Sequence, residues 1–217
     1  MCKLFSIIFL RRIKIANFLH KGDIPKNIEF KGDLAIDTEA MGLNNLRDRL
    51  CLLQISDGRG DAHLVQFKPG QYSAPNLKKL LSDKKRQKII HFARFDVAII
   101  KYYLEVDLFP VYCTKIASRL ARTYTDRHGL KDLCKELVNI DISKQQQTSN
   151  WGAEELTDEQ IKYAASDVMY LHEIRDSLSR MLEDEGRMEL ANACFHAVPT
   201  LAALDLLGWK PVELFEH

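Results

Sequence analysis

The sequence has almost no excess of charge of either sign. Across 217 residues, 31 lysines and arginines face 30 aspartates and glutamates, and the formal net charge is +1. Affinity for long polynucleotides usually rests on many contacts between Lys or Arg and phosphates, so this balance argues against a large basic platform for nucleic acid. It leaves open a small phosphate-bearing substrate that is held by metal ions.

Cysteines are few and widely spaced. Five are present, an odd number, and no two form the C-x-x-C pair that is typical of zinc and redox sites. The pattern favours a reduced, cytoplasmic protein whose cysteines are ordinary core residues.

Long hydrophobic runs are missing as well. The apolar stretch "LFSIIFL" at 4–10 is far too short to span a bilayer, and no small-residue cleavage site of a signal peptide follows it. We therefore expect no membrane association. We expect residues 1–12 to be an N-terminal extension, either disordered or upstream of the true start, with an extra strand as the alternative, and residues 13–217 to form a single domain.

What is present is a series of short apolar runs that gives way to helical patterns. Strand-like runs at 34–41, 49–57 and 61–67 predict a three-stranded meander, because polar, Gly-containing turns separate them. Further strands are expected at 88–93 and at the start of 111–121. Thr157 and Gln160 have the spacing of a capping box and predict the start of one long helix over 158–186. Other helices are expected at 71–88, 94–106, 129–140 and 187–215, so the fold class is α/β, a mixed sheet flanked by helices.

Four acidic residues interrupt apolar patterns. Asp37 and Glu39 lie two residues apart at the end of an apolar strand, so both carboxylates emerge on one face. Asp96 and Asp167 each have apolar neighbours three and four positions away on a helix. A buried unpaired carboxylate is costly, and it is tolerated when it is paired, neutralised or bound to a cation. Oxygen ligands of this kind suit Mg²⁺ or Mn²⁺.

Each acid also has an ordinary explanation when it is taken alone. Asp37 fits a strand-end residue that caps a turn, Asp96 fits an acid in the first turn of a helix, and Tyr163 fits a half-buried core aromatic. Their joint occurrence in one chain favours a metal site over four separate coincidences.

The same residues resemble those of a known family. Asp-x-Glu on a first strand, an Asp in a mid-chain helix and Tyr-x-x-x-Asp on a late helix resemble the DEDD 3′–5′ exonucleases, in the subclass with a tyrosine. The blocks "IDTEAMGLNNLRDRLCLLQIS", "IIHFARFDVAII" and "QTSNWGAEELTDEQIKYAASDVMYLHEI" are similar to the three sequence blocks of ribonuclease D, over about Asp33 to Arg180. This resemblance implies a ribonuclease H-like (DnaQ-like exonuclease) fold.

The short chain lacks the helical domains that follow the nuclease domain of ribonuclease D. It therefore looks more like the bacterial nano-RNase C group, whose members finish very short RNAs, notably dinucleotides, and assemble as octameric rings. The resemblance thus implies short RNA as substrate and a homo-oligomer as the working form. A ribonuclease-D-like enzyme that trims longer RNA or single-stranded DNA is the alternative. A non-catalytic nucleic-acid-binding module and an aspartyl phosphatase are disfavoured, because all four acids are present and a phosphatase gives no reason for Tyr163 and Asp167.

The resemblance also implies roles for the site residues. Two Mg²⁺ or Mn²⁺ ions would support phosphodiester hydrolysis. Asp37, Glu39 and Asp167 would hold the ion that activates water, Asp37 would bridge to the second ion, and Asp96 would assist directly or through water. Tyr163 would orient the attacking water or help to take its proton.

Contacts to the substrate are expected at the junctions that follow the strands. Leu43 is either a wedge against a base or a core residue, Phe95 a packing residue, and His91 a substrate or supporting residue. Trp151 either stacks on a base or anchors its loop. The candidate substrate-binding residues are Met41, Gly42, Leu43, His91, Phe95 and Trp151.

Two further segments have an ordinary and a functional interpretation. The basic stretch from Arg119 to Lys131 is either a solvated helix end or a site for a 5′ phosphate. The apolar segment "TLAALDLLGW" is either a core helix or a subunit interface.

Overall fold

The computed structural model describes residues 16–143, 145–210, 213–214 and 216. The expected N-terminal extension, residues 1–12, lies outside this range. Among the described residues, no helix combines the length and the apolar character that a membrane crossing requires.

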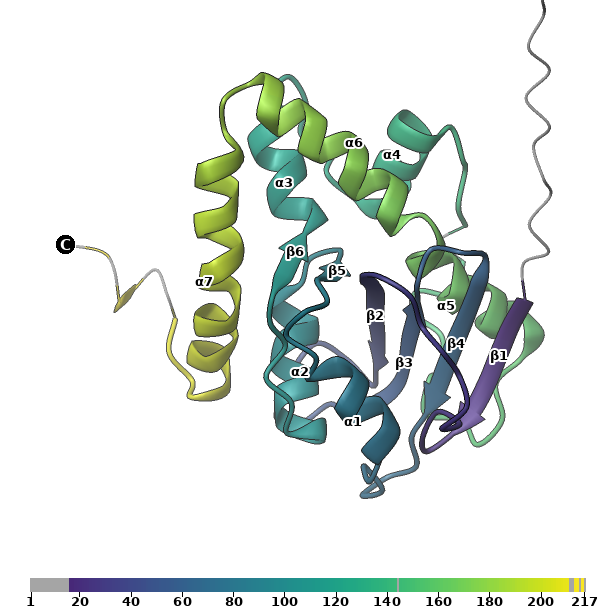
Figure 1. Ribbon diagram of the computed structural model, residues 1–217. Coiled ribbons are helices and arrows are strands. Elements are labelled where there is room, and N and C mark those ends of the chain that lie inside the picture. The colour runs from purple at the N-terminus through teal and green to yellow at the C-terminus, as the bar shows by residue number, and fades with distance from the viewer. Residues whose placement is uncertain (1–15, 144, 211–212, 215, 217) are drawn as a thin grey trace, which may run out of the picture.

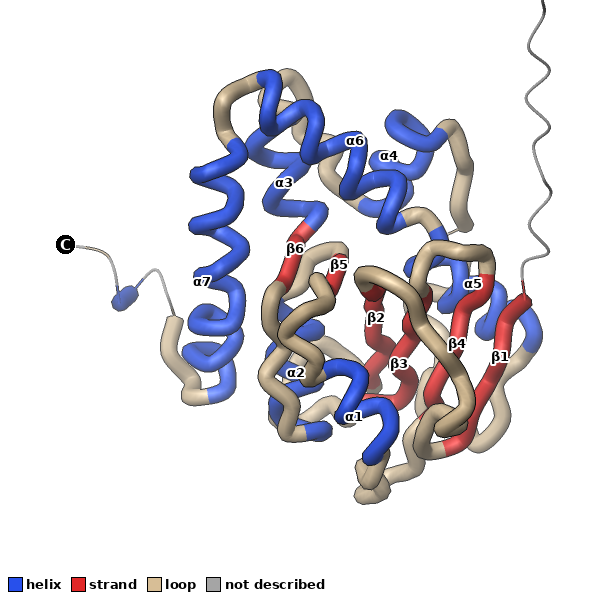
Figure 2. The backbone as a smooth tube through the Cα atoms, viewed as in Figure 1, coloured by secondary structure: helices blue, strands red, loops and turns tan. Residues whose placement is uncertain are grey.

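The centre of the molecule is a mixed six-stranded sheet with the order β1-β4-β3-β2-β5-β6 (Figures 1 and 2). Strands β2, β3 and β4 are antiparallel neighbours and confirm the expected meander, whereas β1 runs parallel to β4, and β5 and β6 continue the sheet in parallel beyond β2. All residues of β3 are buried, since this strand lies inside the sheet and both its faces are covered. The strands are β1 (Ala16–Lys21), β2 (Leu34–Ala40), β3 (Leu50–Ser56), β4 (Asp61–Gln66), β5 (Lys88–Ile90) and β6 (Val111–Cys113).

Helices cover both faces of the sheet and confirm the expected α/β class. Helix α5 packs across β1 to β4 on one face, and α1 and α2 lie on the other face (Figure 1). Helix α7 packs against α2, and α6 packs against α3. The helices are α1 (Pro75–Leu81), α2 (Arg94–Leu104), α3 (Thr114–Ala121), α4 (Leu130–Leu133), the π-helix η1 (Cys134–Val138), α5 (Asp158–Met169), α6 (Leu171–Asp184) and α7 (Met188–Leu206).

Several expectations differ from the structure, and three of them concern the course of the chain. Strand β1 was not expected, because its six residues have no alternating apolar pattern and lie at the edge of the sheet. The long helix expected over 158–186 is two helices, with a break at Tyr170, whose φ is −108° and ψ 0°. The break directs α5 along the sheet and α6 toward α3, which one straight helix could not do. The C-terminal helix ends at Leu206, earlier than expected.

The start of α5 agrees with its sequence signature. The Thr157 side chain accepts from the backbone N–H of Gln160 at 3.2 Å, and the Gln160 side chain accepts from the backbone N–H of Thr157 at 2.9 Å. This capping box satisfies two N–H groups that would otherwise lack partners. It fixes where α5 begins and therefore the position of the residues farther along it.

Candidate active site

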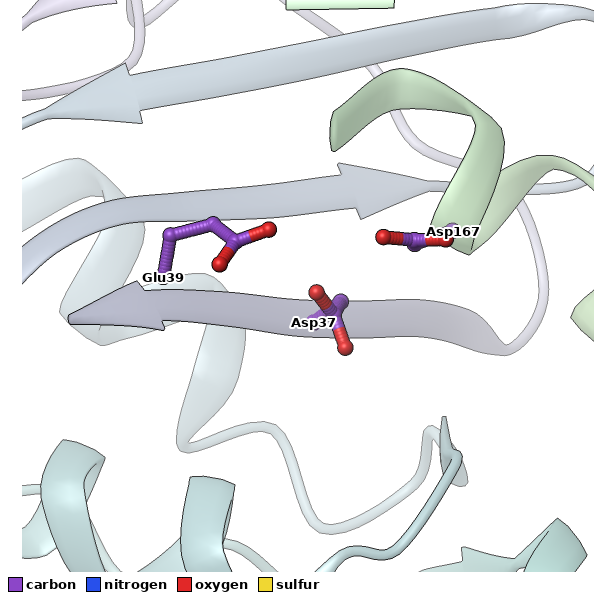
Figure 3. A group of neighbouring side chains, drawn as sticks. All are labelled: Asp37, Glu39 and Asp167. Carbon is purple, nitrogen blue, oxygen red and sulfur yellow. The ribbon is translucent and has the colours of Figure 1, made fainter. Parts of the chain in front are cut away.

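Three acids converge on the face of the sheet that α5 covers. Asp37 and Glu39 project from β2, and Asp167 comes from α5 above them (Figure 3). Each offers a carboxylate oxygen, and these oxygens all lie within 4.8 Å of one another. Among the described residues, no Lys or Arg forms an ion pair with any of the three. A cluster of like charges at this spacing is stable only when protons or cations neutralise it, and its all-oxygen ligands fit Mg²⁺ or Mn²⁺.

Asp96 approaches β2 from a different direction. Strand β5 pairs with β2 only from Leu34 to Ile36, so the edge of β2 at Thr38 has no neighbouring strand on that side. The first turn of α2 fills this space, and Asp96 accepts a hydrogen bond from Thr38 Oγ1 at 2.6 Å and another from the Thr38 backbone N–H. Asp96 is 4% exposed and lies outside the cluster of three. Its negative charge nevertheless raises the pKa of both Asp37 and Glu39.

Burial raises the pKa of all four acids. Burial together with the charges of Asp167 and Asp96 raises the pKa of Glu39 to about 9, and the pKa of Asp37 lies well above its usual range for the same two reasons. Burial raises the pKa of Asp96 to about 7, although hydrogen bonds from Thr38 act in the opposite direction. The pKa of Asp167 is also raised by burial to about 7, against a hydrogen bond from Tyr163. The cluster therefore binds either protons or cations at neutral pH.

Tyr163 lies one helical turn before Asp167, and both residues line a cavity that opens beside the acids. Burial and the charge of Asp167 raise the pKa of its phenol well above the ordinary value, so the hydroxyl keeps its proton at neutral pH. Trp151 packs beside it, with ring centroids 6.0 Å apart. Trp151 is only 2% exposed, which favours the loop-anchor interpretation over base stacking.

A cavity of about 330 Å³ opens beside the acids. His91 lines it, with Nδ1 2.9 Å from Thr114 Oγ1. Lys115 and Lys131 add positive charge to its lining, and Lys131 also pairs with Asp141 at 3.0 Å. The acids and the lysines thus present opposite charges to one small space, which suits a phosphate-bearing ligand.

Sequence reasoning did not identify Phe92, which the structure places at the rim of this cavity. Its φ of +62° lies in the left-handed region that non-glycine residues rarely adopt. Phe92 is 53% exposed, and Lys115 Nζ lies 4.0 Å from the centroid of its ring. Backbone strain of this kind gathers at functional sites, but only the coordinates reveal it, because no pattern around Phe92 indicates a positive φ.

Leu43 and Phe95 line a second, adjoining cavity, and Phe92 lies on the border between the two. Leu43 is 88% exposed, so the alternative of a core leucine is wrong. Phe95 is partly buried and packs against the core, as expected.

The loop that carries Leu43 depends on Gly42. A Cβ atom at this position would lie 2.3 Å from Asp48 Oδ2. That oxygen accepts from the backbone N–H of Asn44 at 3.0 Å and so closes the loop. Met41 precedes Gly42 and is 53% exposed. Its N–H donates to Arg49 O at 3.1 Å and so ties the loop to the residue that precedes β3.

The basic stretch is not uniformly a solvated helix end. The Arg122 side chain is fully buried and forms an ion pair with Glu136. It also donates to Ser118 Oγ at 2.9 Å and to Arg127 O at 2.7 Å. For Arg122 the expectation of a solvated side chain is therefore wrong, because the arginine ties the loop that follows α3 to η1. Among the described residues of the stretch, its C-terminal end, Gly129, Leu130 and Lys131, lines the cavity, and Lys131 is the basic residue among them.

The fold and the acidic site together define a nuclease of the 3′–5′ exonuclease class. Residues 19–183 match the family model for "3'-5' exonuclease", and the chain belongs to this family. Among solved structures, the chain is similar to NrnC of Brucella melitensis bound to pGG, with 50% sequence identity and a TM-score of 0.90 over 94% of this chain and 99% of that chain. It is also similar to the same protein with bound Mg²⁺, with 49% identity and a TM-score of 0.87 over 92% and 98% of the two chains.

Two relatives of known name match this chain over a much smaller share of their own length than the solved structures do. The chain is 34% identical to DNA polymerase I of Aquifex aeolicus over 161 residues, which are 73% of this chain and 26% of the polymerase. It is 33% identical to ribonuclease D of Gluconacetobacter diazotrophicus over 157 residues, which are 72% of this chain and 39% of that enzyme. The chain thus spans well under half the length of these two relatives, and what they share with it is the exonuclease domain.

Proposed function

We propose that this protein is a metal-dependent 3′–5′ exoribonuclease that hydrolyses short RNA, preferentially dinucleotides, to 5′-mononucleotides. The observation that carries the proposal is the cluster of Asp37, Glu39 and Asp167, which opens into a small cavity with lysines in its lining. A volume of about 330 Å³ is at the lower end of the range for small-ligand sites, which is about 300–1,000 Å³, and suits the end of a short substrate. The similarity to NrnC bound to pGG supports the same substrate class.

The acids provide the ligand set for the implied ions. Asp37, Glu39 and Asp167 would hold Mg²⁺ or Mn²⁺, and Asp96 would assist from the edge of β2. Two bound ions would supply the activation of the attacking water and the neutralisation of charge on the leaving 3′ oxygen. The mutual repulsion of the unneutralised acids, visible as raised pKa values, supports this assignment.

The remaining residues position the substrate. The Tyr163 hydroxyl, which keeps its proton, would hold the attacking water by a hydrogen bond rather than take its proton. Lys115 and Lys131 would face substrate phosphate, and the exposed Phe92 and Leu43 would contact its bases. His91, which lines the cavity, would support the terminal nucleotide, and Met41, two residues after Glu39, would do so from the loop that follows β2.

The proposal is tested by incubating 5′-labelled RNAs of two to about twenty nucleotides with the protein and Mg²⁺. We expect dinucleotides to disappear much faster than long RNA. We expect Leu43→Ala to slow the reaction mainly through a higher KM, since the Leu43 side chain would contact a base of the substrate rather than the reacting atoms. If long RNA is shortened steadily while dinucleotides persist, trimming in the manner of ribonuclease D replaces the short-substrate proposal. The same assay with single-stranded DNA measures the preference for the sugar.

Tyr163→Phe separates water positioning from metal binding. We expect kcat to fall by about 10²-fold, because the lost hydroxyl orients the attacking water. The increase in melting temperature that Mg²⁺ causes should stay within a degree or two of the wild-type value, since the four acids remain. An unchanged kcat would contradict the role given to the hydroxyl.

A homo-oligomer is part of the proposal, with the octameric ring as the form that the resemblance implies. Leu190 on α7 is 55% exposed, and Leu207 and Trp209, just after α7, are 74% and 57% exposed. Exposed apolar side chains of this size often mark interaction surfaces, which supports an interface at this part of the molecule.

A cytoplasmic location also belongs to the proposal. Cys51, Cys113, Cys134 and Cys194 are all free thiols. Free thiols are typical of proteins kept in a reducing compartment.

A further inference from the structure

Gln54 is a buried amide without a hydrogen-bond partner. It lies in the middle of β3 and is 0% exposed, and neither its Oε1 nor its Nε2 has a partner among the described residues. An amide can donate two hydrogen bonds and accept two, and burying one with none of them made costs roughly 1–3 kcal/mol. Three other described residues have a buried side-chain polar atom without a partner, and in each of them a single atom is involved. These atoms are Asn45 Oδ1, Trp151 Nε1 and His172 Nδ1.

The position of Gln54 in the sheet relates it to the acids. In the antiparallel register of β2 and β3, Gln54 lies directly opposite Asp37. Residues that are directly opposite project to the same face, with Cβ atoms about 4.5–5.5 Å apart. Gln54 and Asp37 therefore share the face that α5 covers and from which Asp167 approaches.

We propose that Gln54 is a positioning residue for Asp37. Its side-chain N–H donates to the Asp37 carboxylate when the acids hold a divalent cation, and thereby keeps this carboxylate correctly oriented toward the ion. A residue that hydrogen-bonds to a metal ligand without itself touching the ion typically contributes about 10–100-fold to the metal affinity, as its removal shows. The proposal rests on the proposed function, and it explains why a costly amide is retained in a strand where a methionine of similar size would pack without penalty.

Gln66 provides a matched control on the same face of the sheet. It lies on β4 opposite Leu52, two residues from Gln54 along β3, and is 6% exposed. Unlike Gln54 it has partners, because its Nε2 donates to Ala153 O at 2.8 Å and its Oε1 accepts from Lys21 Nζ at 2.5 Å. Replacing each glutamine in turn by methionine removes the same amide from the same face of the sheet, and of the two only Gln54 lies opposite Asp37.

The test measures Mg²⁺ affinity by calorimetry and melting temperature for the wild type, Gln54→Met and Gln66→Met. We expect Gln54→Met to melt at or above the wild-type temperature in EDTA, yet to bind Mg²⁺ about tenfold more weakly, with kcat recovering at saturating Mg²⁺. Gln66→Met should melt at a lower temperature and bind Mg²⁺ normally. Gln54→Leu serves as a second variant if the methionine variant does not fold.

The outcomes separate this proposal from the proposed function. If the wild type binds Mg²⁺ and hydrolyses RNA while a folded Gln54 variant binds Mg²⁺ with wild-type affinity, the role of Gln54 is overturned and the proposed function stands. If the wild type neither binds Mg²⁺ nor hydrolyses RNA, the proposed function fails, and the role of Gln54 fails with it.

Discussion

Asp37→Asn should abolish hydrolysis, with a loss of kcat of at least about 10³-fold, because even a single preorganised group that acts on the transition state contributes about 10²–10³-fold. Asp37 shares the acidic cluster with Glu39 and Asp167, and all three offer oxygens within 4.8 Å of one another. The amide keeps the shape of the side chain but removes the negative charge that a cation requires. The measurement is single-turnover hydrolysis of a 5′-labelled dinucleotide with Mg²⁺.

The same substitution should raise the stability of the metal-free protein. The pKa of Asp37 is raised by burial and by the charges of Asp96, Asp167 and Glu39, so the ionised side chain is disfavoured in the folded state. The neutral amide relieves this repulsion, and the melting temperature in EDTA should rise. Asp61→Asn is the matched control, since Asp61 is an exposed acid at the start of β4, and neither activity nor melting temperature should change much. An active Asp37→Asn enzyme would contradict the assignment of the site.

Removal of metal should destabilise the protein, and this loss of stability should grow as the pH rises. In the folded state the pKa is about 7 for Asp96 and Asp167 and about 9 for Glu39, well above the values of unfolded chains. A folded state that holds protons more tightly than the unfolded state loses stability as pH rises from the unfolded pKa to the folded pKa. Without metal, this loss therefore extends from about pH 4 to pH 9, and bound cations offset it because they replace the protons.

The measurement is the melting temperature with EDTA and with excess Mg²⁺ at pH 5.5 and pH 8.5. A ligand present at 100 times its Kd stabilises by about 2.7 kcal/mol, and for a protein of this size that corresponds to an increase of about 5–10 °C. We expect an increase of this order at pH 8.5 and only a degree or two at pH 5.5, where protons already neutralise most of the cluster. Equal increases at both pH values would show that the acids do not govern metal binding.

The shared orientation of Asp37 with Glu39, and of Tyr163 with Asp167, could be predicted because each pair is close in sequence. Asp37 and Glu39 share a face because a strand has a period of two, and Tyr163 and Asp167 share one because they are four residues apart on a helix. The capping box of Thr157 and Gln160 likewise depends on residues three apart. In each case the geometry is set by bonds and hydrogen bonds within a few residues, so the sequence alone carries it.

Features that depend on contacts between distant segments could not be predicted in this way. Nothing local in β1 indicates that it pairs with β4, and no glycine or proline marks the break at Tyr170. The burial of Arg122 depends on Glu136, fourteen residues away, and the positive φ of Phe92 is imposed where β5 meets α2.

The sequence by itself determined the chemical character of the site, because the four acids and Tyr163 stand in patterns whose periodicity orients them. Only the tertiary structure decided how the acids meet. Helix α5 crosses the sheet and brings Asp167 over Asp37. The short strand β5 leaves the edge of β2 open for Asp96. It also placed the unpartnered Gln54 opposite Asp37. The physical reason is that side-chain direction follows local backbone geometry, whereas the distance between two elements is set by the packing of the whole core.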